Sequence, residues 1–260
     1  TQKMLDSVTG DVLEELSQNQ KSLPNESSFV FVGNVNADTF EKQICKYIAT
    51  LPVQKKAVIH DPHTALTTDS TEFVRAYNSE PRSEVTLYYH QDRPYNREEY
   101  LDLIALTQLV NVRLREEVRE KIGAVYGVGL RSSHVRLPNE HYLGKITFSC
   151  EPSRVDEILL KIDEVLTSLM QKPVNQSYID AIKKIRHSKH DDAIKTNQFW
   201  LNILSKKRFY NDDYHEIESY KAWIDTITPK RLQKAANNYF KSATKITTIL
   251  NPKEPSNDRH

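Results

Sequence analysis

Cysteine and glycine are scarce in this sequence, and their scarcity disfavours two common kinds of site. The chain contains two cysteines, Cys45 and Cys150, which are too few for a disulfide framework or a cysteine-built zinc site. Both lie among apolar neighbours, so we expect two buried free thiols. The six glycines form no glycine-rich loop of the kind that holds the phosphates of a nucleotide. Nucleotide-dependent functions are therefore disfavoured.

Long apolar runs and an excess of one charge are also missing. No run approaches the roughly 20 apolar residues that a membrane-spanning helix needs, so we predict no membrane insertion. The 36 basic and 35 acidic residues give a net charge of +1, and this balance predicts no nucleic-acid partner. A basic run from Lys183 to Lys189 favours an independent nucleic-acid-binding module, but such a run on a helix is usually a solvated face.

The order of predicted strands and helices indicates an α+β fold. Apolar residues that alternate or form short runs predict strands at 71–77, 83–90, 124–133, 141–150 and 244–250. Apolar residues at helical spacing predict helices at 96–121, 153–171, 175–195, 197–209, 213–224 and 229–240. Because the strands come in adjacent pairs, we expect a mostly antiparallel sheet with helices packed on one face.

The first quarter of the chain has a different pattern. The apolar run Phe29 to Val32 predicts a buried core strand, and the following helix begins at the predicted cap Asp38. Residues 53–70 have no period and read as a linker. We therefore predict an N-terminal segment at 1–68, which holds the end of a preceding α+β domain plus the linker. An α+β domain at 69–252 and a polar tail at 253–260 follow. Since the chain opens at Thr1, we expect a piece of a longer protein.

Four segments, taken in order, resemble one known family. Residues 31–35 read FVGNV, residues 118–128 read VREKIGAVYGV, residues 146–157 read ITFSCEPSRVDE, and residues 195–201 read KTNQFWL. Each segment is weak alone, but together they resemble pitrilysin/insulinase-type zinc metallopeptidases, in particular the bacterial zinc peptidases of that family. The resemblance covers residues 29 to about 250.

The resemblance implies a clamshell protein of two halves, each built of two similar α+β domains, with the zinc site in the N-terminal half. This chain would belong to the C-terminal, non-zinc half and would carry the family's C-terminal domain at 69–252. It would bind peptide substrate and help close the cleavage chamber, with the N-terminal catalytic half or a homologous subunit as partner. The alternative is a non-catalytic partner subunit of the same fold. The implied compartment is the bacterial periplasm or another extracytoplasmic site.

The histidines do not form the family's zinc motif. That motif, H-x-x-E-H, places two histidines on one helical face with a glutamate as general base. No two of the nine histidines here are four positions apart. The pairs His187 with His190 and His60 with His63 have closer spacing, but basic neighbours favour a solvated face for the first pair. We predict no metal ligand and no catalysis by this chain alone, and the resemblance implies zinc in the missing N-terminal half.

Arg119 and Tyr126 are the predicted substrate-binding residues. The resemblance implies that an arginine and a tyrosine at this spacing reach the substrate backbone near the scissile carbonyl. Arg119 should end a helix, Gly123 should turn the chain, and Tyr126 should enter the next strand, so both can converge at one rim. A guanidinium and a phenol can each donate a hydrogen bond to a carbonyl or a developing oxyanion. Retention of both favours a substrate-binding half over a purely architectural subunit.

A plainer interpretation of the pair is structural. An arginine in the last turn of a helix is favoured by the helix dipole, and a tyrosine in a strand needs no special role. The aromatic residues Phe199 and Trp200, with Asn197, are expected to pack helices. The run Gly127-Val128-Gly129, after Tyr126, is too short for a nucleotide motif and is expected to allow close backbone approach in a strand.

Overall fold

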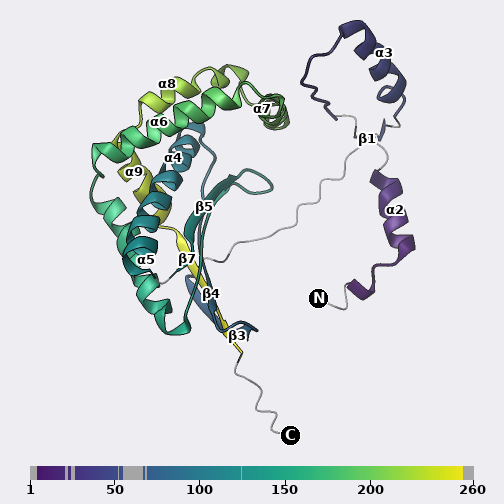
Figure 1. Ribbon diagram of the computed structural model, residues 1–260. Coiled ribbons are helices and arrows are strands. Elements are labelled where there is room, and N and C mark those ends of the chain that lie inside the picture. The colour runs from purple at the N-terminus through teal and green to yellow at the C-terminus, as the bar shows by residue number, and fades with distance from the viewer. Residues whose placement is uncertain are drawn as a thin grey trace. The chain divides into compact units, whose positions relative to one another are not determined.

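The chain folds into two compact units, whose elements are labelled in Figure 1. The computed structural model describes residues 5–20, 23–24, 27–51, 53–54, 67, 69–123 and 125–253. One unit comprises Thr1–Asp61 with Lys189–Ser219, and the other comprises Pro62–Ser188 with Tyr220–His260. The division predicted at residues 68 and 252 stays a prediction, and most of the predicted linker and tail lie outside the described residues.

The second unit is built on a five-stranded sheet of order β3-β7-β4-β6-β5. Its strands are β3 (Thr71–Asn78), β4 (Ser83–Asp92), β5 (Val128–Val135), β6 (His141–Cys150) and β7 (Thr244–Pro252). Only β3 and β7 pair in parallel among the described strands of this sheet; the other neighbours are antiparallel. Helices cover one face of the sheet (Figure 1). The predicted α+β class is confirmed.

The helices of this unit follow the predicted ranges closely. They are α4 (Arg97–Leu114), α5 (Val155–Gln171), α6 (Gln176–Ala193), α8 (Tyr220–Asp225) and α9 (Pro229–Phe240). The residues of α6 from Lys189 onward belong to the first unit. The core lies between helices and sheet, and Leu87, Leu103 and Ile146 are fully buried in it. Apolar burial of this kind is the main force that holds such a layer pair together.

Caps decide where several helices begin. The side chain of Asn96 accepts a hydrogen bond from the Glu99 N–H at 3.0 Å and so starts α4. Thr228 caps α9, with Pro229 in the first turn, where a missing N–H costs nothing. Ser153 does not cap α5 as predicted, because it lies in a short 3₁₀ turn, Pro152–Arg154. The helix predicted at 213–224 divides into the 3₁₀ turn Tyr214–Ile217 and α8.

The first unit contains short elements. These are α2 (Gly10–Gln20), α3 (Ala37–Tyr47), α7 (Asn197–Tyr210) and the parallel pair β1 (Leu23–Pro24) and β2 (Val53–Gln54). The predicted core strand from Phe29 to Val32 is wrong: Phe29 is 47% exposed and Phe31 is 46% exposed. An apolar run becomes a strand only where a neighbouring strand pairs with its backbone, and the described residues of this unit supply none to it.

Two further expectations fail in the first unit. Asn36, not Asp38, caps α3, because its side chain accepts a hydrogen bond from the Thr39 N–H at 3.0 Å. Cys45 lies in α3, which has no buried residue, and its thiol is exposed; Cys150, in β6, is buried as predicted. The apolar neighbours of Cys45 in sequence do not form a core in this unit, so they do not bury the thiol.

Candidate functional site

Arg119 lies in an unusual continuation of α4. The helix ends at Leu114, and residues Arg115–Glu120 follow as a π-helical segment. The Lys121 N–H donates to the Glu116 carbonyl, five residues back, as the π pattern requires. Val118 of this segment is fully buried, whereas Arg119 beside it is exposed. The predicted extent of the helix is correct, but the sequence pattern does not predict its change of hydrogen bonding.

Tyr126 lies in the connection between this segment and β5. Gly123 has φ of 66°, a left-handed conformation that glycine adopts without steric cost, and it ends the helix as predicted. Val125 is buried, and Tyr126 is 87% exposed. Because β5 begins only at Val128, Tyr126 lies in a bend before the strand, not inside it as predicted. Its ring therefore has none of the packing that a strand position would impose.

The two predicted substrate residues present unused hydrogen-bond donors. Both side chains are exposed, and neither makes a hydrogen bond or ion pair with another of the described residues. They lie at the two ends of one short connection, residues 119–126, which also contains Gly123. A guanidinium and a phenol so placed can donate to a carbonyl oxygen of an incoming chain. Their role in substrate binding stays a prediction.

Ion pairs and hydrogen bonds from neighbouring side chains stabilise the π-helical segment. The Arg113 guanidinium contacts Glu116 and Glu117, both at 3.0 Å, and Lys121 contacts Glu117 at 2.8 Å. The hydroxyl of Tyr178, from the first turn of α6, accepts from Arg113 at 2.9 Å and donates to Glu116 at 2.7 Å. The hydrogen bond from Lys121, with the charges of both cations, lowers the pKa of Glu117 although partial burial opposes this shift.

The strand on the other side of the connection is fixed to α4. Asn111 of α4 donates to the Leu130 carbonyl at 2.9 Å and accepts from the Leu130 N–H at 2.7 Å. A Cβ atom at Gly129 would lie 3.1 Å from the Asn111 Oδ1, so the glycine allows the two elements to approach. The close backbone approach expected at Gly127 to Gly129 is wrong, because the atom near Gly129 belongs to a side chain and a Cβ atom at Gly127 would have nothing within 4 Å. Asn111 was not predicted, since a polar residue on a helix carries no signal of its partner.

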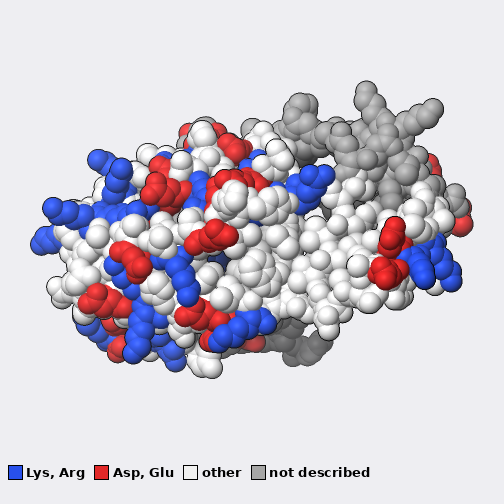
Figure 2. Space-filling model, turned by 90° about the horizontal axis from the view of Figure 1, so that it is seen from above, with Lys and Arg blue, Asp and Glu red and all other residues white. Residues whose placement is uncertain are grey.

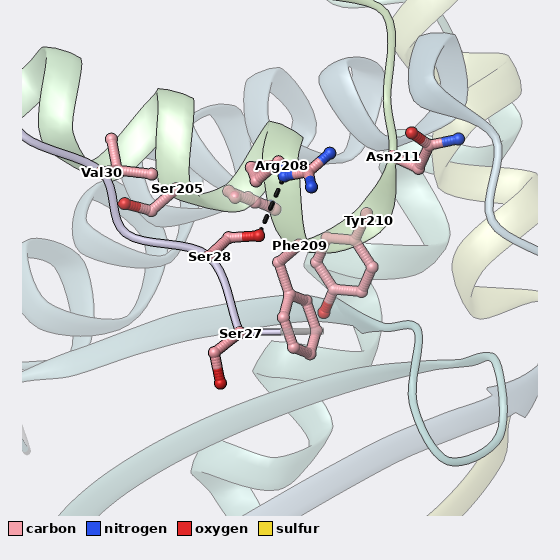
Figure 3. Close-up of a pocket in the computed structure, with 9 residues that line it drawn as sticks. Ser27, Ser28, Val30, Ser205, Arg208, Phe209, Tyr210 and Asn211 are labelled. Carbon is pink, nitrogen blue, oxygen red and sulfur yellow. Dashed lines mark hydrogen bonds between the residues drawn. The ribbon is translucent and has the colours of Figure 1, made fainter. Parts of the chain in front are cut away.

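A surface pocket lies in the first unit. Figure 3 shows it between residues Ser27 to Val30 and the C-terminal end of α7, where Arg208 Nε donates to Ser28 Oγ at 3.0 Å. Phe209 lies in this pocket and is 70% exposed. Its described lining residues include no carboxylate, histidine or cysteine, which are the usual side-chain ligands of metal ions. Figure 2 shows acidic and basic side chains interspersed over the face in view.

Comparison with known proteins identifies the family. The model of the peptidase M16 inactive domain matches residues 11–186, which is more than half of the chain. The chain belongs to this family. It is 23% identical over 246 residues to a probable zinc protease, PqqL, of Haemophilus influenzae, which covers 90% of this chain and 26% of that protein. The chain thus spans about a quarter of the length of the curated relatives that it matches most extensively.

Two solved structures of proteases share the fold. The periplasmic protease PqqL from Escherichia coli aligns with a TM-score of 0.73 at 21% identity, over 85% of this chain and 25% of that one. The ferredoxin protease FusC, solved with Arabidopsis ferredoxin, aligns with a TM-score of 0.73 at 18% identity, over 97% and 28%. At these identities the likeness establishes the fold alone.

The described residues of this chain do not form the zinc-binding site of the wider peptidase family. His187 Nε2 lies 2.9 Å from Asp225, and the ring of His190 packs against Phe199 with 5.8 Å between ring centres. Across the described part of the chain, no three His, Cys, Asp or Glu side chains gather as a metal would require. His60 and His63 lie outside the described residues.

Three other residues that carried the sequence resemblance, Asn197, Phe199 and Trp200, lie at the start of α7, outside the range matched by the family model. Phe199 and Trp200 are half-buried with 5.3 Å between ring centres, and the Trp200 indole donates to the Ile194 carbonyl at 2.8 Å. Phe199 packs against His190 of α6, as expected of helix packing, and Trp200 bonds the turn between α6 and α7, whereas Asn197 is exposed. Within the described ranges, no helix has the length and apolar character to cross a membrane.

Proposed function

We propose that this chain is a substrate-binding part of a zinc metalloendopeptidase. In this proposal it binds peptide through Arg119 and Tyr126, closes a cleavage chamber opposite a zinc-bearing half, and does not cleave peptide alone. The observation that carries the proposal is the pair of exposed side chains at the two ends of residues 119–126, with donors that no described residue uses. Membership of the inactive-domain family supports it.

Hydrogen-bond donors suit the chemistry of peptide cleavage. Attack on a peptide carbonyl places negative charge on its oxygen, and donors already in position stabilise that charge more than they stabilise the substrate. A guanidinium gives a charge-assisted bond and stays protonated at any working pH. The Tyr126 phenol adds a neutral donor. Neither group has a hydrogen-bond partner among the described residues, so binding substrate displaces water from them and breaks no described hydrogen bond within the chain.

The missing zinc ligands define the partner. Since this chain carries no H-x-x-E-H motif, the metal and the general base belong to another segment, either an N-terminal half of the same protein or a homologous subunit. Relatives described as zinc proteases, of which the match covers 25% and 26%, are consistent with this arrangement. We also propose an extracytoplasmic site, because one aligned structure is that of a periplasmic protease.

Turnover by the assembled protease tests the proposal. Arg119→Ala and Tyr126→Phe are introduced into this chain, which is then combined with the zinc-bearing half, and peptide cleavage is followed by fluorescence. Each substitution should lower kcat by about 10²-fold, because it removes a donor to the transition state. Arg75→Ala and Tyr77→Phe, on the edge strand β3, are matched controls and should leave kcat unchanged.

The same experiment separates the alternative function. A stable complex with the zinc-bearing half, in which both Arg119→Ala and Tyr126→Phe cleave at the control rate, would reject the substrate-binding role. That result would favour the non-catalytic partner subunit. Cleavage by this chain alone, sensitive to a zinc chelator, would contradict the proposal entirely.

A further inference from the structure

We propose that Tyr178 is a positioning residue for Arg119. In this proposal Tyr178, with Arg113 and Glu116, holds residues Arg115–Glu120 in their π-helical form and thereby sets the direction in which the Arg119 side chain leaves the helix. The inference rests on the proposed function, in which Arg119 binds the peptide backbone. It adds a residue from α6 that the family resemblance did not indicate.

The contacts form a closed triangle. Arg113 Nη1 lies 3.0 Å from Glu116 and 2.9 Å from the Tyr178 hydroxyl, and that hydroxyl lies 2.7 Å from the same Glu116 oxygen. Arg113 lies in the last turn of α4, Glu116 in the π-helical segment, and Tyr178 in another helix. The triangle therefore joins the regular helix, the irregular segment and a separate support.

A second set of contacts, centred on Glu117, also fixes the π-helical segment. The other nitrogen of the guanidinium, Arg113 Nη2, lies 3.0 Å from Glu117, which Lys121 contacts from the far end of the segment at 2.8 Å. The side chains of Arg113 and Glu117 are 23% and 17% exposed, so solvent competes only partly for these bonds. The Tyr178 ring also packs beneath the Arg113 guanidinium, 5.5 Å from ring centre to Cζ.

The π-helical form matters because it changes the face on which residue 119 lies. A π turn bonds residue i to i+5 and holds more residues than an α turn, which holds 3.6. If residues 115–120 reverted to an α-helix, the residues of the segment, Arg119 among them, would rotate about the helix axis. Leu114 and Val118, four apart and both fully buried, keep the apolar side of the segment on the core. Arg119 is consequently held on the exposed side.

The test is a double-mutant cycle on peptide binding by the full 260-residue chain. Affinity for a fluorescein-labelled unstructured peptide is measured by anisotropy for the wild type, Arg119→Ala, Tyr178→Phe and the double variant. Tyr178→Phe keeps the ring and loses only the hydroxyl, and it should weaken binding about fivefold when Arg119 is present. In the Arg119→Ala background it should have no further effect. Tyr77→Phe, an exposed tyrosine of the same unit, is the matched control.

Hydrogen exchange gives a readout that does not depend on binding. The amides of residues 115–121 should exchange faster in Tyr178→Phe than in Tyr77→Phe, with the rest of the second unit unchanged. Thermal unfolding of each variant confirms that the fold is retained.

The possible failures are distinguishable. Unchanged affinity in Arg119→Ala would overturn the proposed function, and the positioning role with it. If Arg119→Ala weakens binding but Tyr178→Phe does not, the proposed function stands and this inference is rejected. A loss in Tyr178→Phe of equal size with and without Arg119 also rejects it, because the hydroxyl would then act on the peptide or the fold and not through Arg119.

Discussion

Asn111 of α4 forms a two-bond bridge to the backbone of Leu130 in β5, with donor–acceptor distances of 2.9 Å and 2.7 Å. The bridge lies between the two elements that flank Arg119 and Tyr126 in sequence. It satisfies both backbone groups of a residue whose side chain is 2% exposed. The helix before the predicted substrate residues and the strand after them are therefore fixed to each other, while Arg119 and Tyr126 are themselves exposed.

Replacing Asn111 should destabilise the second unit. Asn111→Ala leaves the N–H and carbonyl of Leu130 without partners in a half-buried place, which costs about 1–3 kcal/mol. Urea unfolding followed by circular dichroism measures the loss, and Asn139→Ala, at an exposed position, is the control. Equal midpoints for the two variants would show that water replaces the bridge without cost.

Two neighbouring glycines give a matched pair of variants. A Cβ atom at Gly129 would lie 3.1 Å from the Asn111 Oδ1, whereas one at Gly127 has nothing within 4 Å. Gly129→Ala must push away the oxygen that accepts from Leu130, so it should cost about 1–2 kcal/mol of unfolding free energy. Gly127→Ala should be neutral or slightly stabilising, because it restricts the unfolded chain. The same urea measurement compares them, and equal destabilisation of both would contradict the packing argument.

The carboxylate of Glu117 should make stability depend on pH in the acid range. Its pKa is lowered by the Lys121 hydrogen bond and by the charges of Arg113 and Lys121. A lowered pKa in the folded state contributes stability above the ordinary value of 4.5, and that contribution is lost as pH falls through the folded value. Because Lys121 is largely exposed, the contribution is small, about 0.5 kcal/mol.

The comparison with Glu117→Gln isolates this contribution. The free energy of unfolding should be lower in Glu117→Gln than in the wild type at pH 7, and the difference should shrink below pH 4.5. Glu84→Gln removes an exposed carboxylate of β4 and serves as the control. A wild-type advantage that persists unchanged into acid would show that the carboxylate's charge is not what the neighbouring cations stabilise.

The sequence predicts those elements that depend on interactions between residues close in the chain, and it fails where an element depends on residues far away in the chain. The spacing of Val155 to Leu169 predicts α5 correctly, because a helix with one buried face has apolar residues at regular helical spacing in its own sequence. Phe29 to Val32 has an equally apolar pattern but no strand beside it among the described residues of its unit, so pattern alone gave the wrong state. A local apolar pattern shows that a segment can form a strand, and the segment forms one only where a neighbouring strand pairs with it.

In the candidate site, too, the sequence identified the residues of one local segment but not their distant contacts. Arg119, Gly123 and Tyr126 were found through a sequence resemblance within one short segment. Tyr178 was not, because its contact with Glu116 joins residues 62 positions apart and depends on how α6 packs. The π-helical form was also missed, since residues 115–120 have the composition of an ordinary charged helix. Sequence thus located the exposed groups, and the tertiary fold supplied what holds them.

Three buried tyrosines predict the behaviour of the core in alkali. Tyr89, Tyr142 and Tyr239 are at most 5% exposed, and their hydroxyls have no hydrogen-bond partner among the described residues. Burial raises the pKa of each. Nearby ionisable groups raise the pKa of Tyr89 and Tyr142 further, whereas at Tyr239 the charge of Glu99 raises the pKa and Arg93 opposes this shift. A raised pKa means that the folded state keeps the proton, so stability is complete below the ordinary value of 10.0 and is lost as pH rises above it.

The rise in phenolate absorbance, followed in the ultraviolet during alkaline titration, should show these three rings ionising only as the chain unfolds. Tyr142→Phe removes a buried hydroxyl that has no described partner, so it should leave neutral stability unchanged or raise it by up to about 1 kcal/mol. It should also move the alkaline unfolding midpoint upward, whereas Tyr77→Phe, at an exposed position, should not. If all 13 tyrosines ionise reversibly while circular dichroism stays native, the core is open to hydroxide and the burial argument fails.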